Sequence, residues 1–301
     1  MKKISIYVFL TAVFCFTSCT TFGKELASGT ITGGAIIADM FLGGTGSVSD
    51  IGAGVGSAIM ATEDFLPEPS YYLGRSVGAI IVSQYGADFS DMDKILYLNN
   101  ICWTLQVNSP EIVPFKGYHV LILDTDEINS FATTGGHIFI SRGILNSLKS
   151  EDEIAAVIAH EMSHIQLEHG TRAIKQSRWG EAGASILSGT IGLVSGDDSS
   201  KAFADTVAES ANTLISSGYS KDWEYEADEN AVLLLYQSGY SPDALVSALS
   251  DLEKNPEYSK GGLTNTHPTP KNRIKKVKKQ VGKYPSVQIP PNRESRYKKY
   301  F

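Results

Sequence analysis

Two histidines and a glutamate lie close together near the middle of the chain, in the pattern His160-Glu161-x-x-His164. In a helix, residues four positions apart lie only about 40° apart around the axis, so both imidazoles project from one face. Two neutral imidazoles on one face can bind Zn²⁺, and Glu161 stands where it can reach a water on that metal. The pattern predicts a zinc site with His160 and His164 as ligands and Glu161 as the general base.

The surrounding residues help to decide between this prediction and two ordinary surface histidines. With six His in 301 residues, the five-residue pattern arises by chance in roughly one chain of this length in a hundred. The stretch around the pattern is apolar almost all round, which indicates a buried helix. Buried imidazoles need polar partners, and a metal ion supplies them. We therefore favour the zinc site.

Signals for both ends of this helix frame the stretch 150–170. Ser150 with Glu153 three residues later is a capping box, and the acidic first turn suits the positive end of the helix dipole. Gly170 fits the position just past the last turn, which needs a left-handed backbone. These signals predict one continuous helix.

Zinc with two His ligands needs a third protein ligand. His169 lies five residues after His164, about 140° around the same helix, and we expect it to point away at the surface. Glu224 and Asp228 are better candidates because they are four apart and face one way in a helix predicted over 221–238. Glu224 can ligate zinc while Asp228 accepts the second ring proton of a ligating histidine. The alternative is that both belong to a solvated acidic face.

Four motifs follow one another between positions 71 and 279. They are Asn129-Ser130-Phe131-Ala132-Thr133-Thr134-Gly135-Gly136-His137-Ile138-Phe139-Ile140-Ser141-Arg142-Gly143-Ile144-Leu145, His160-Glu161-x-x-His164, Glu224-x-x-Ala227-Asp228 and Thr266-His267-Pro268-x-x-x-x-Arg273-Ile274. Together they resemble the CAAX prenyl endopeptidase, or HtpX-type, family of zinc metallopeptidases (gluzincins), in its soluble exported lipoprotein branch. Lys221 stands where that family often has Arg, and Thr133-Thr134 where it often has Leu-Pro. Neither departure removes a ligand.

The resemblance implies a zinc metalloendopeptidase that hydrolyses peptide bonds with zinc-activated water. It implies one zinc per chain and places His267 near the metal. As a donor, His267 can stabilise the oxyanion formed during hydrolysis. As an acceptor, it can instead occupy the fourth zinc position and hold the enzyme latent. Both readings stay open, and we favour latency because an exported protease among folded neighbours needs restraint.

Two other functions fit the same motifs. The first is a zinc-containing chaperone or assembly factor for envelope proteins with little proteolysis. An intact Glu161 argues against a purely structural zinc site, which a fourth ligand normally closes. The second is a zinc aminopeptidase. This function would be favoured if the protein released only the N-terminal residues of its substrates. For the endopeptidase we expect misfolded or unassembled cell-envelope proteins as substrates.

A short β-rich run over 137–141 directly precedes the helix with the two histidines. We predict an edge strand there, with Gly136, His137, Ile138 and Phe139 as the strand that binds substrate. Unpaired strand groups can hold an extended peptide through main-chain hydrogen bonds, and Gly135-Gly136 allows close backbone approach. An ordinary core strand is the alternative.

The first eighteen residues have the features of a bacterial lipoprotein signal. Two lysines precede an apolar run over 4–16, and small residues lead to Cys19. A plain signal peptide or an uncleaved anchor are alternatives, although the run is too short to span a membrane comfortably. We expect an exported protein with a lipid on Cys19, anchored to the cell envelope on the periplasmic face of the outer membrane. Cys102 is then left without a disulfide partner.

Composition divides the rest of the chain into three segments. Residues 19–70 are expected to form a Gly/Ser-rich tether, 71–282 the zinc metallopeptidase domain, and 283–301 a basic tail. The fold class is α+β and predominantly helical, with a small β-sheet in a zincin-like domain. The export signal and the acidic net charge of −7 argue against nucleic acid as a partner. The C-terminal lysines are expected to face water or anionic lipid.

Overall fold

The computed structural model describes residues 67–111, 113–176, 197–260, 263, 267 and 269–301. These residues belong to one compact unit of the chain. The predicted signal segment 1–18, Cys19 and the predicted tether as far as residue 66 lie outside the described residues.

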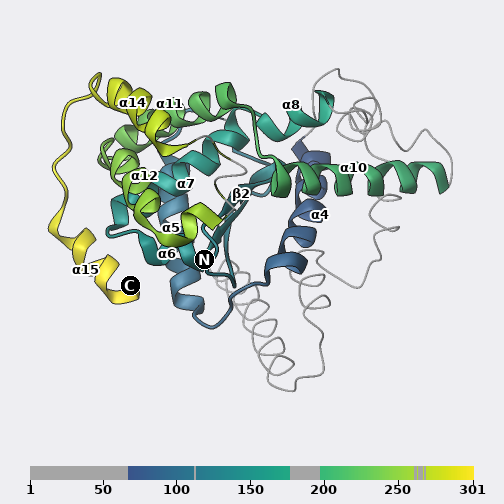
Figure 1. The fold of residues 1–301 in the computed structure, drawn as a ribbon, viewed down its shortest axis with the longest axis horizontal. Coiled ribbons are helices and arrows are strands. Elements are labelled where there is room, and N and C mark those ends of the chain that lie inside the picture. Colours follow the sequence, from purple (N-terminus) through teal and green to yellow (C-terminus); the bar gives the residue numbers. More distant parts are fainter. Residues whose placement is uncertain (1–66, 112, 177–196, 261–262, 264–266, 268) are drawn as a thin grey trace, which may run out of the picture. The chain divides into compact units, whose positions relative to one another are not determined.

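Helix α7 (Glu151–Gln166) carries the His-Glu-x-x-His pattern and lies at the centre of the fold (Figure 1). Every residue over 151–164 is buried, as the apolar sequence predicts. The predicted N-terminus is confirmed, because Ser150 Oγ accepts a hydrogen bond from the Glu153 amide at 3.2 Å. The Glu153 carboxylate in turn accepts from the Lys149 amide at 2.7 Å. These bonds satisfy donors at the start of the helix, where no intrahelical acceptor exists.

The prediction of one continuous helix over 150–170 is wrong. Helix α7 ends at Gln166, and the left-handed residue that follows is Glu168, with a φ of 55°. A second helix, α8 (His169–Gln176), starts immediately afterwards. Gly170 therefore lies inside α8 and is not a C-cap. The chain changes direction between His164 and His169, so their relative positions do not follow helical geometry.

Helices from distant parts of the chain pack against α7, and three of them make the most extensive contacts. They are α5 (Met92–Val107), α11 (Lys221–Gln237) and α12 (Ala244–Lys254). Helix α11 starts where Ser220 Oγ accepts a hydrogen bond from the Trp223 amide at 3.4 Å. The helix predicted over 221–238 is thus confirmed, and it packs on α7 as expected.

A mixed three-stranded sheet among the described residues packs beside α7. Strand β1 (His119–Leu123) is parallel to β3 (His137–Ser141), and β2 (Ser130–Ala132) is antiparallel to β3. The order β1-β3-β2 places β3 in the middle, with a hydrogen-bonded strand on each side. The prediction of an edge strand over 137–141 is therefore wrong. All residues of β3 are buried, so its β-rich sequence reflects a core position.

Helix α4 (Pro67–Tyr85) packs on the turn η1 (Thr134–Gly136), which joins β2 to β3. A Cβ on Gly74 would lie 1.7 Å from the carbonyl oxygen of Thr134. Gly135 has a φ of 75°, and a Cβ on it would lie 2.3 Å from Tyr71 Cα. The close backbone approach predicted for this glycine is thus made to α4 within the fold. Helix α10 (Asp197–Ser216) contacts both α4 and α8 (Figure 1).

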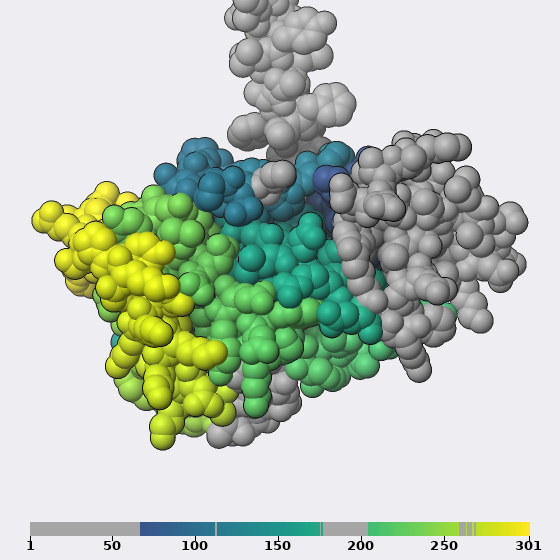
Figure 2. Space-filling view, turned by 90° about the horizontal axis from the view of Figure 1, so that it is seen from above, coloured from purple at the N-terminus to yellow at the C-terminus, as the bar shows by residue number. Residues whose placement is uncertain are grey.

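The C-terminal part of the chain packs on the second half of the domain. Helix α14 (Pro270–Val281) contacts α11 and α12, and it buries Val277 completely. The segment 283–301, predicted as a basic tail, contains α15 (Pro291–Tyr300), which contacts α7. The remaining short elements are α6 (Arg142–Ser147) and η3 (Pro256–Lys260). The yellow C-terminal residues occupy one flank of the face shown in Figure 2.

The predicted fold class, a predominantly helical α+β domain with a small sheet, is confirmed. Within the described part of the chain, no helix has both the length and the apolar character that a membrane span requires.

Candidate metal centre

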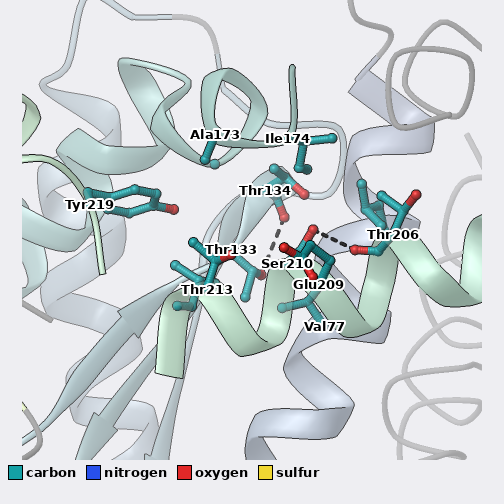
Figure 3. A pocket seen from close by; sticks show the side chains of 13 residues that line it. Val77, Thr133, Thr134, Ala173, Ile174, Thr206, Glu209, Ser210, Thr213 and Tyr219 are labelled. Atoms are coloured by element: carbon teal, nitrogen blue, oxygen red, sulfur yellow. Dashed lines mark hydrogen bonds between the residues drawn. The ribbon is translucent and has the colours of Figure 1, made fainter. Parts of the chain in front are cut away.

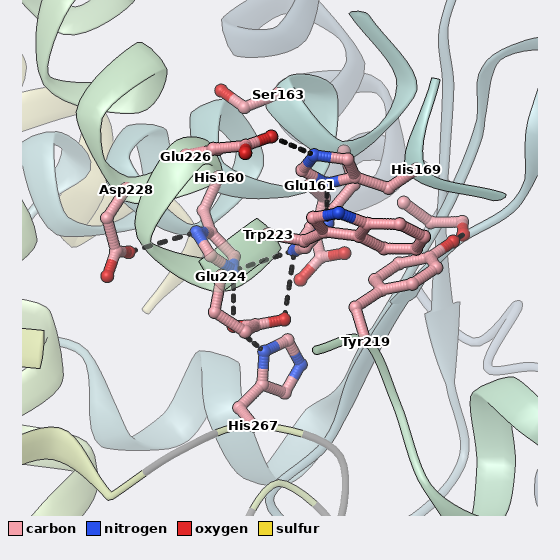
Figure 4. Close-up of polar contacts among 12 residues, drawn as sticks. His160, Glu161, Ser163, His169, Tyr219, Trp223, Glu224, Glu226, Asp228 and His267 are labelled. Atoms are coloured by element: carbon pink, nitrogen blue, oxygen red, sulfur yellow. Dashed lines mark hydrogen bonds and ion pairs between the residues drawn. The ribbon is translucent and has the colours of Figure 1, made fainter. Parts of the chain in front are cut away.

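Four buried side chains from three segments meet at one point: His160, His164, Glu224 and His267. The two histidines of α7 face Glu224 from the first turn of α11, and His267 approaches from the segment before α14 (Figure 4). One ligand atom from each of the four lies within 4.8 Å of the others. The residues that the sequence predicted as ligands are thus brought together, with His267 beside them.

The imidazole nitrogens and the carboxylate oxygens of these four residues lie close to one another. The Nε2 atoms of His160 and His164 are 3.1 Å apart, and they lie 3.5 Å and 3.3 Å from the Glu224 oxygens Oε2 and Oε1. His267 Nδ1 lies 2.5 Å from Glu224 Oε2. Glu224 Oε1 is buried and makes no hydrogen bond with the described residues. Several ring nitrogens and carboxylate oxygens therefore face one point, with too few N–H groups to pair all of them by hydrogen bonds. Such a group of electron-pair donors fits a bound cation.

The charges of these groups are strongly coupled. Burial opposes the charge on Glu224, but the imidazoles of His267 and His164 outweigh burial and hold the pKa of this carboxyl well below its usual range. Burial and Arg273 oppose protonation of His160, yet bonds to Asp228 and Glu224 outweigh them and raise the pKa of His160 to about 9. Burial lowers the pKa of His164. A cation that enters the site has to displace the proton of His160, so its binding weakens as the pH falls.

Asp228 holds the outer nitrogen of His160, as the sequence predicted. His160 Nδ1 lies 3.1 Å from Asp228 Oδ1. Arg273 of α14 donates from Nη2 to Oδ1 at 2.7 Å and from Nε to Oδ2 at 2.9 Å. Burial opposes the charge on Asp228, but Arg273 outweighs it, and the pKa of Asp228 falls to about 2. The carboxylate therefore stays charged and keeps accepting from His160.

Arg273 belongs to the last of the four sequence motifs, and the motif alone predicts no role for it. It is buried, and Val277 four residues later is buried on the same side of α14. An arginine on the apolar face of an otherwise basic helix was the signal, because a buried guanidinium needs a buried acid.

Glu161 lies beside the donor group and has one close polar partner that the sequence did not reveal. Ser130 Oγ of β2 donates a hydrogen bond to Glu161 Oε1 at 2.7 Å, and both side chains are buried. This bond fixes the direction of the carboxylate relative to the two histidines. No local pattern points to Ser130, since the contact joins residues thirty-one positions apart.

The expectation that His169 lies at the surface is wrong. Its side chain is fully buried, and its Nδ1 lies 2.8 Å from Nδ1 of His164. The angle predicted for one continuous helix does not apply, because the chain turns at Glu168 before α8 starts. Burial and the neighbouring His164 ring lower the pKa of His169 to about 4.

The residues predicted as a substrate strand lie away from the cleft and inside the core. Phe139 is fully buried, Ile138 is 1% exposed, and the ring of His137 packs 4.9 Å from that of Tyr71. A Cβ on Gly136 would lie 2.2 Å from a backbone oxygen of the domain itself. The function assigned to these residues required an open edge, which β3 lacks.

A cleft of about 310 Å³, open to solvent, lies next to His164. Its wall includes Ala132 at the end of β2 and the two threonines that follow. Tyr219 also lines it, stacks on His164 with ring centroids 4.6 Å apart, and donates to the carbonyl oxygen of Ala132 at 3.3 Å. The same tyrosine borders a second, much smaller cavity of about 30 Å³ between α4, α8 and α10 (Figure 3).

A helical α+β domain with this donor group and an adjacent glutamate defines the class of metallopeptidases that carry a His-Glu-x-x-His helix. The sequence model of peptidase family M48 matches residues 106–281, and the chain belongs to this family. The predicted family resemblance is confirmed, and membership implies a metal.

Several named relatives share parts of the chain. It is 26% identical over 247 residues to the beta-barrel assembly-enhancing protease of Escherichia coli, which covers 79% of this chain and 48% of the relative. It is 26% identical over 155 residues to metalloprotease LoiP of the same organism, covering 52% and 59%. It is 28% identical over 158 residues to the mitochondrial metalloendopeptidase OMA1 of Arabidopsis thaliana, covering 52% and 30%. The chain thus spans about half the length of the first of these relatives.

Proposed function

We propose that this protein is a zinc metalloendopeptidase. The observation that carries the proposal is the convergence of His160, His164 and Glu224, with Glu161 beside them, in a buried site. Two imidazole nitrogens and one carboxylate oxygen are the donor set of many catalytic zinc sites, and mixed N/O donors of this kind suit Zn²⁺ better than Mg²⁺ or Ca²⁺.

The reaction follows from the positions of the side chains. His160, His164 and Glu224 would hold the ion, which when bound would polarise the scissile carbonyl and lower the pKa of water. Glu161 takes a proton from the attacking water and delivers it to the leaving amine. Ser130 holds the Glu161 carboxylate in a fixed orientation beside the site through its 2.7 Å hydrogen bond. Asp228 and Arg273 hold the ring of His160 in place from behind.

We infer that the polypeptide substrate binds along β2 in the open cleft. Strand β2 has one strand neighbour among the described residues, which leaves its other edge without a strand. Ala132, at the end of this strand, lines the cleft together with His164. Main-chain hydrogen bonds to such an edge tolerate many sequences, which suits misfolded or unassembled proteins as substrates.

We also propose that His267 holds the resting enzyme latent. Its Nδ1 lies 2.5 Å from a ligand oxygen of Glu224, and it completes the group of four donors. A fourth protein ligand occupies the position that water or substrate needs in a catalytic zinc site. This position supports the latent role over that of an oxyanion donor.

Export and lipid anchoring complete the proposal. The lipoprotein-type signal and Cys19 support an anchor in the bacterial cell envelope, at the periplasmic face of the outer membrane. The tether predicted over 19–70 would then be shorter by its last four residues, because α4 begins at Pro67. The name of the beta-barrel assembly-enhancing protease supports envelope proteins as substrates. Labelling of whole cells with a palmitate analogue should mark the wild type and not Cys19→Ser. Equal labelling of the two would exclude the anchor.

The test of the activity is the variant Glu161→Gln. It should keep bound zinc and lose casein cleavage by about 100-fold or more, because a general base contributes on that scale. Glu253→Gln, at an exposed position of α12, is the matched control and should cleave normally. Casein cleavage by Glu161→Gln at the wild-type rate would contradict the proposal. A wild type that binds zinc and prevents aggregation without cleaving any protein would favour the chaperone.

A further inference from the structure

Both ring nitrogens of His164 are engaged. Nε2 faces the donor group, 3.1 Å from His160 Nε2 and 3.3 Å from Glu224 Oε1. Nδ1 points the other way and lies 2.8 Å from Nδ1 of His169. A metal-bound imidazole usually donates its second N–H to a carboxylate, a carbonyl oxygen or a water. Here a second imidazole stands in that place.

The contact continues beyond His169 to a carboxylate at the surface. His169 Nε2 lies 3.3 Å from Glu226 Oε2, and the same oxygen accepts from Arg172 Nη1 at 2.9 Å. The Glu226 side chain is 46% exposed, whereas that of His169 is fully buried. The buried ring therefore connects a metal-site histidine with an ion pair at the surface. Figure 4 shows the part of this connection between His169 and Glu226.

Once a cation is present, the donors and acceptors of these side chains allow only one direction for the series of hydrogen bonds from His164 through His169 to Glu226. His164 offers the lone pair of Nε2 to the cation, so its proton is on Nδ1. That N–H can only donate, so Nδ1 of His169 accepts. The proton of His169 is then on Nε2, where it donates to Glu226 Oε2. Each neutral ring has one donor and one acceptor, and every one of them is used.

Packing fixes the ring of His169 before a metal arrives. The indole of Trp223 stacks on it, with centroids 5.3 Å apart and an interplanar angle of 9°. The guanidinium of Arg172 lies 4.4 Å from the Trp223 ring. Trp223, which stacks on His169, is followed directly on α11 by Glu224, a predicted metal ligand. A ring held in this way cannot rotate freely to break the bond to His164.

We propose that His169 is a positioning residue, which holds His164 in the tautomer and orientation that bind the metal and is itself anchored by Glu226. The proposal rests on the metal site of the proposed function and does not depend on proteolysis. The two α7 histidines then differ in their outer partner: His160 has a buried carboxylate and His164 has an imidazole. The motifs that carry the family resemblance do not include His169.

Zinc affinity, measured on the full chain by competition with a chromophoric chelator, tests the proposal. His169→Leu keeps the volume and removes both hydrogen bonds, and it should weaken zinc binding 10- to 100-fold, as loss of such outer partners does. His169→Asn can present Oδ1 near the place of Nδ1, so it should recover most of the affinity. The visible spectrum of the Co²⁺-loaded protein should change in the Leu variant and stay close to wild type in the Asn variant.

A purely structural role predicts a different result. Both variants would then lower the thermal stability of the metal-free protein alike, without separating in metal affinity. Glu226→Gln should weaken zinc binding less than His169→Leu, because the amide still accepts. Glu229→Gln is the control on the same helix, since Glu229 is exposed and contacts Lys283 at 3.3 Å, and it should bind zinc normally.

Two results would overturn the proposal: wild-type zinc affinity and an unchanged Co²⁺ spectrum in a folded His169→Leu, or a folded His169→Asn as weak as the Leu variant. If His169→Leu does not fold, the variants His169→Asn and Glu226→Gln still test the proposal. Wild-type zinc affinity in Glu226→Gln, together with weak zinc binding in His169→Asn, would show that His169 does not act as an acceptor for His164. A wild type that binds zinc in this His169-dependent way but cleaves no protein would support the inference and reject the proposed function.

Discussion

The two histidines of α7 are supported by different partners, and this shows in their protonation. Arg273 pairs with both oxygens of Asp228, which keeps that carboxylate charged, and the pKa of His160 rises to about 9. His164 faces a neutral ring, and burial lowers its pKa. In the absence of a cation, His160 therefore holds a proton while His164 offers a lone pair.

The variant His267→Ala separates the two roles proposed for this residue. Removal of a fourth ligand should open the site and raise the rate of casein cleavage. The rate should rise by about tenfold or more if at most a tenth of the wild-type molecules have His267 away from the metal. The measurement is the cleavage rate at equal zinc occupancy, with Thr269→Ala, at an exposed neighbouring position, as control. Much slower turnover would instead support the oxyanion role, and an unchanged rate would reject both.

His137 should make the stability of the domain depend on pH. Burial lowers the pKa of His137 to about 3, against 6.5 when unfolded. A lowered folded-state pKa means that the unfolded chain takes up the proton first. The stabilisation is therefore complete above about pH 6.5 and is lost as the pH falls towards 3, at up to about 1.4 kcal/mol per unit for this group.

Urea unfolding of metal-free protein between pH 7 and pH 4 measures this effect. His137→Phe should flatten the slope of the unfolding free energy against pH over this range. His119→Asn is the comparison, because His119 is exposed at the start of β1, and it should change the slope less. An unaltered slope in His137→Phe would mean that other groups carry the acid sensitivity.

At the scale of elements, the contact between α4 and η1 shapes one wall of the cleft. Thr133 and Thr134 line the cleft, and the backbone of Thr134 is pressed against Gly74 of α4. The turn after β2 therefore has its position set by a helix that precedes it by sixty residues in sequence. This links the geometry of the cleft to the packing of α4.

Gly74→Ala should destabilise the protein, although alanine normally favours a helix interior over glycine by about 0.5–1 kcal/mol. The new Cβ would lie 1.7 Å from a backbone oxygen, so the helix and the turn have to move apart. We expect a loss of about 1–3 kcal/mol in urea unfolding, together with slower cleavage. Gly282→Ala, where the nearest atom would be 3.6 Å from the Cβ, should be neutral. A stabilising Gly74→Ala would show that this contact is loose.

At the scale of the whole molecule, the C-terminal helix α15 forms ion pairs with the first turn of α7. Arg293 of α15 donates to Asp152 Oδ1 at 3.0 Å and to the Gly239 carbonyl oxygen at 2.9 Å. Arg296 donates to the buried Glu151, and the family match ends at residue 281, before α15 begins. Acidic residues of the first turn of α7 are thus paired by a segment outside the matched region.

Arg293→Met should lower the free energy of unfolding by about 3 kcal/mol, because it leaves the buried carboxylate of Asp152 without its cation. Both side chains of this pair are at least nine-tenths buried, so solvent screens the pair little. Lys298→Met removes an exposed charge from the same helix and should have almost no effect. Equal stability of the two variants would show that the pair of Arg293 with Asp152 does not stabilise the fold.

Local spacing was enough to predict the chemistry of the site. Two histidines four apart on a helix share a face whatever surrounds them, and the same holds for Glu224 and Asp228. Capping by Ser150 is also local. The helix period therefore identified His160 and His164 as a pair and Glu224 and Asp228 as candidates, and the family resemblance placed those candidates at the same metal site.

Contacts between distant segments were decided only by the tertiary structure. His169 turns inward because α7 ends before it and Glu168 takes a left-handed backbone, which no periodicity predicts. The pairing that makes β3 central, and the ion pairs of Arg273 and Arg293, join residues far apart in sequence. Such contacts depend on how whole elements pack, and the same short β-rich run or basic helix is compatible with either the edge or the core of a domain.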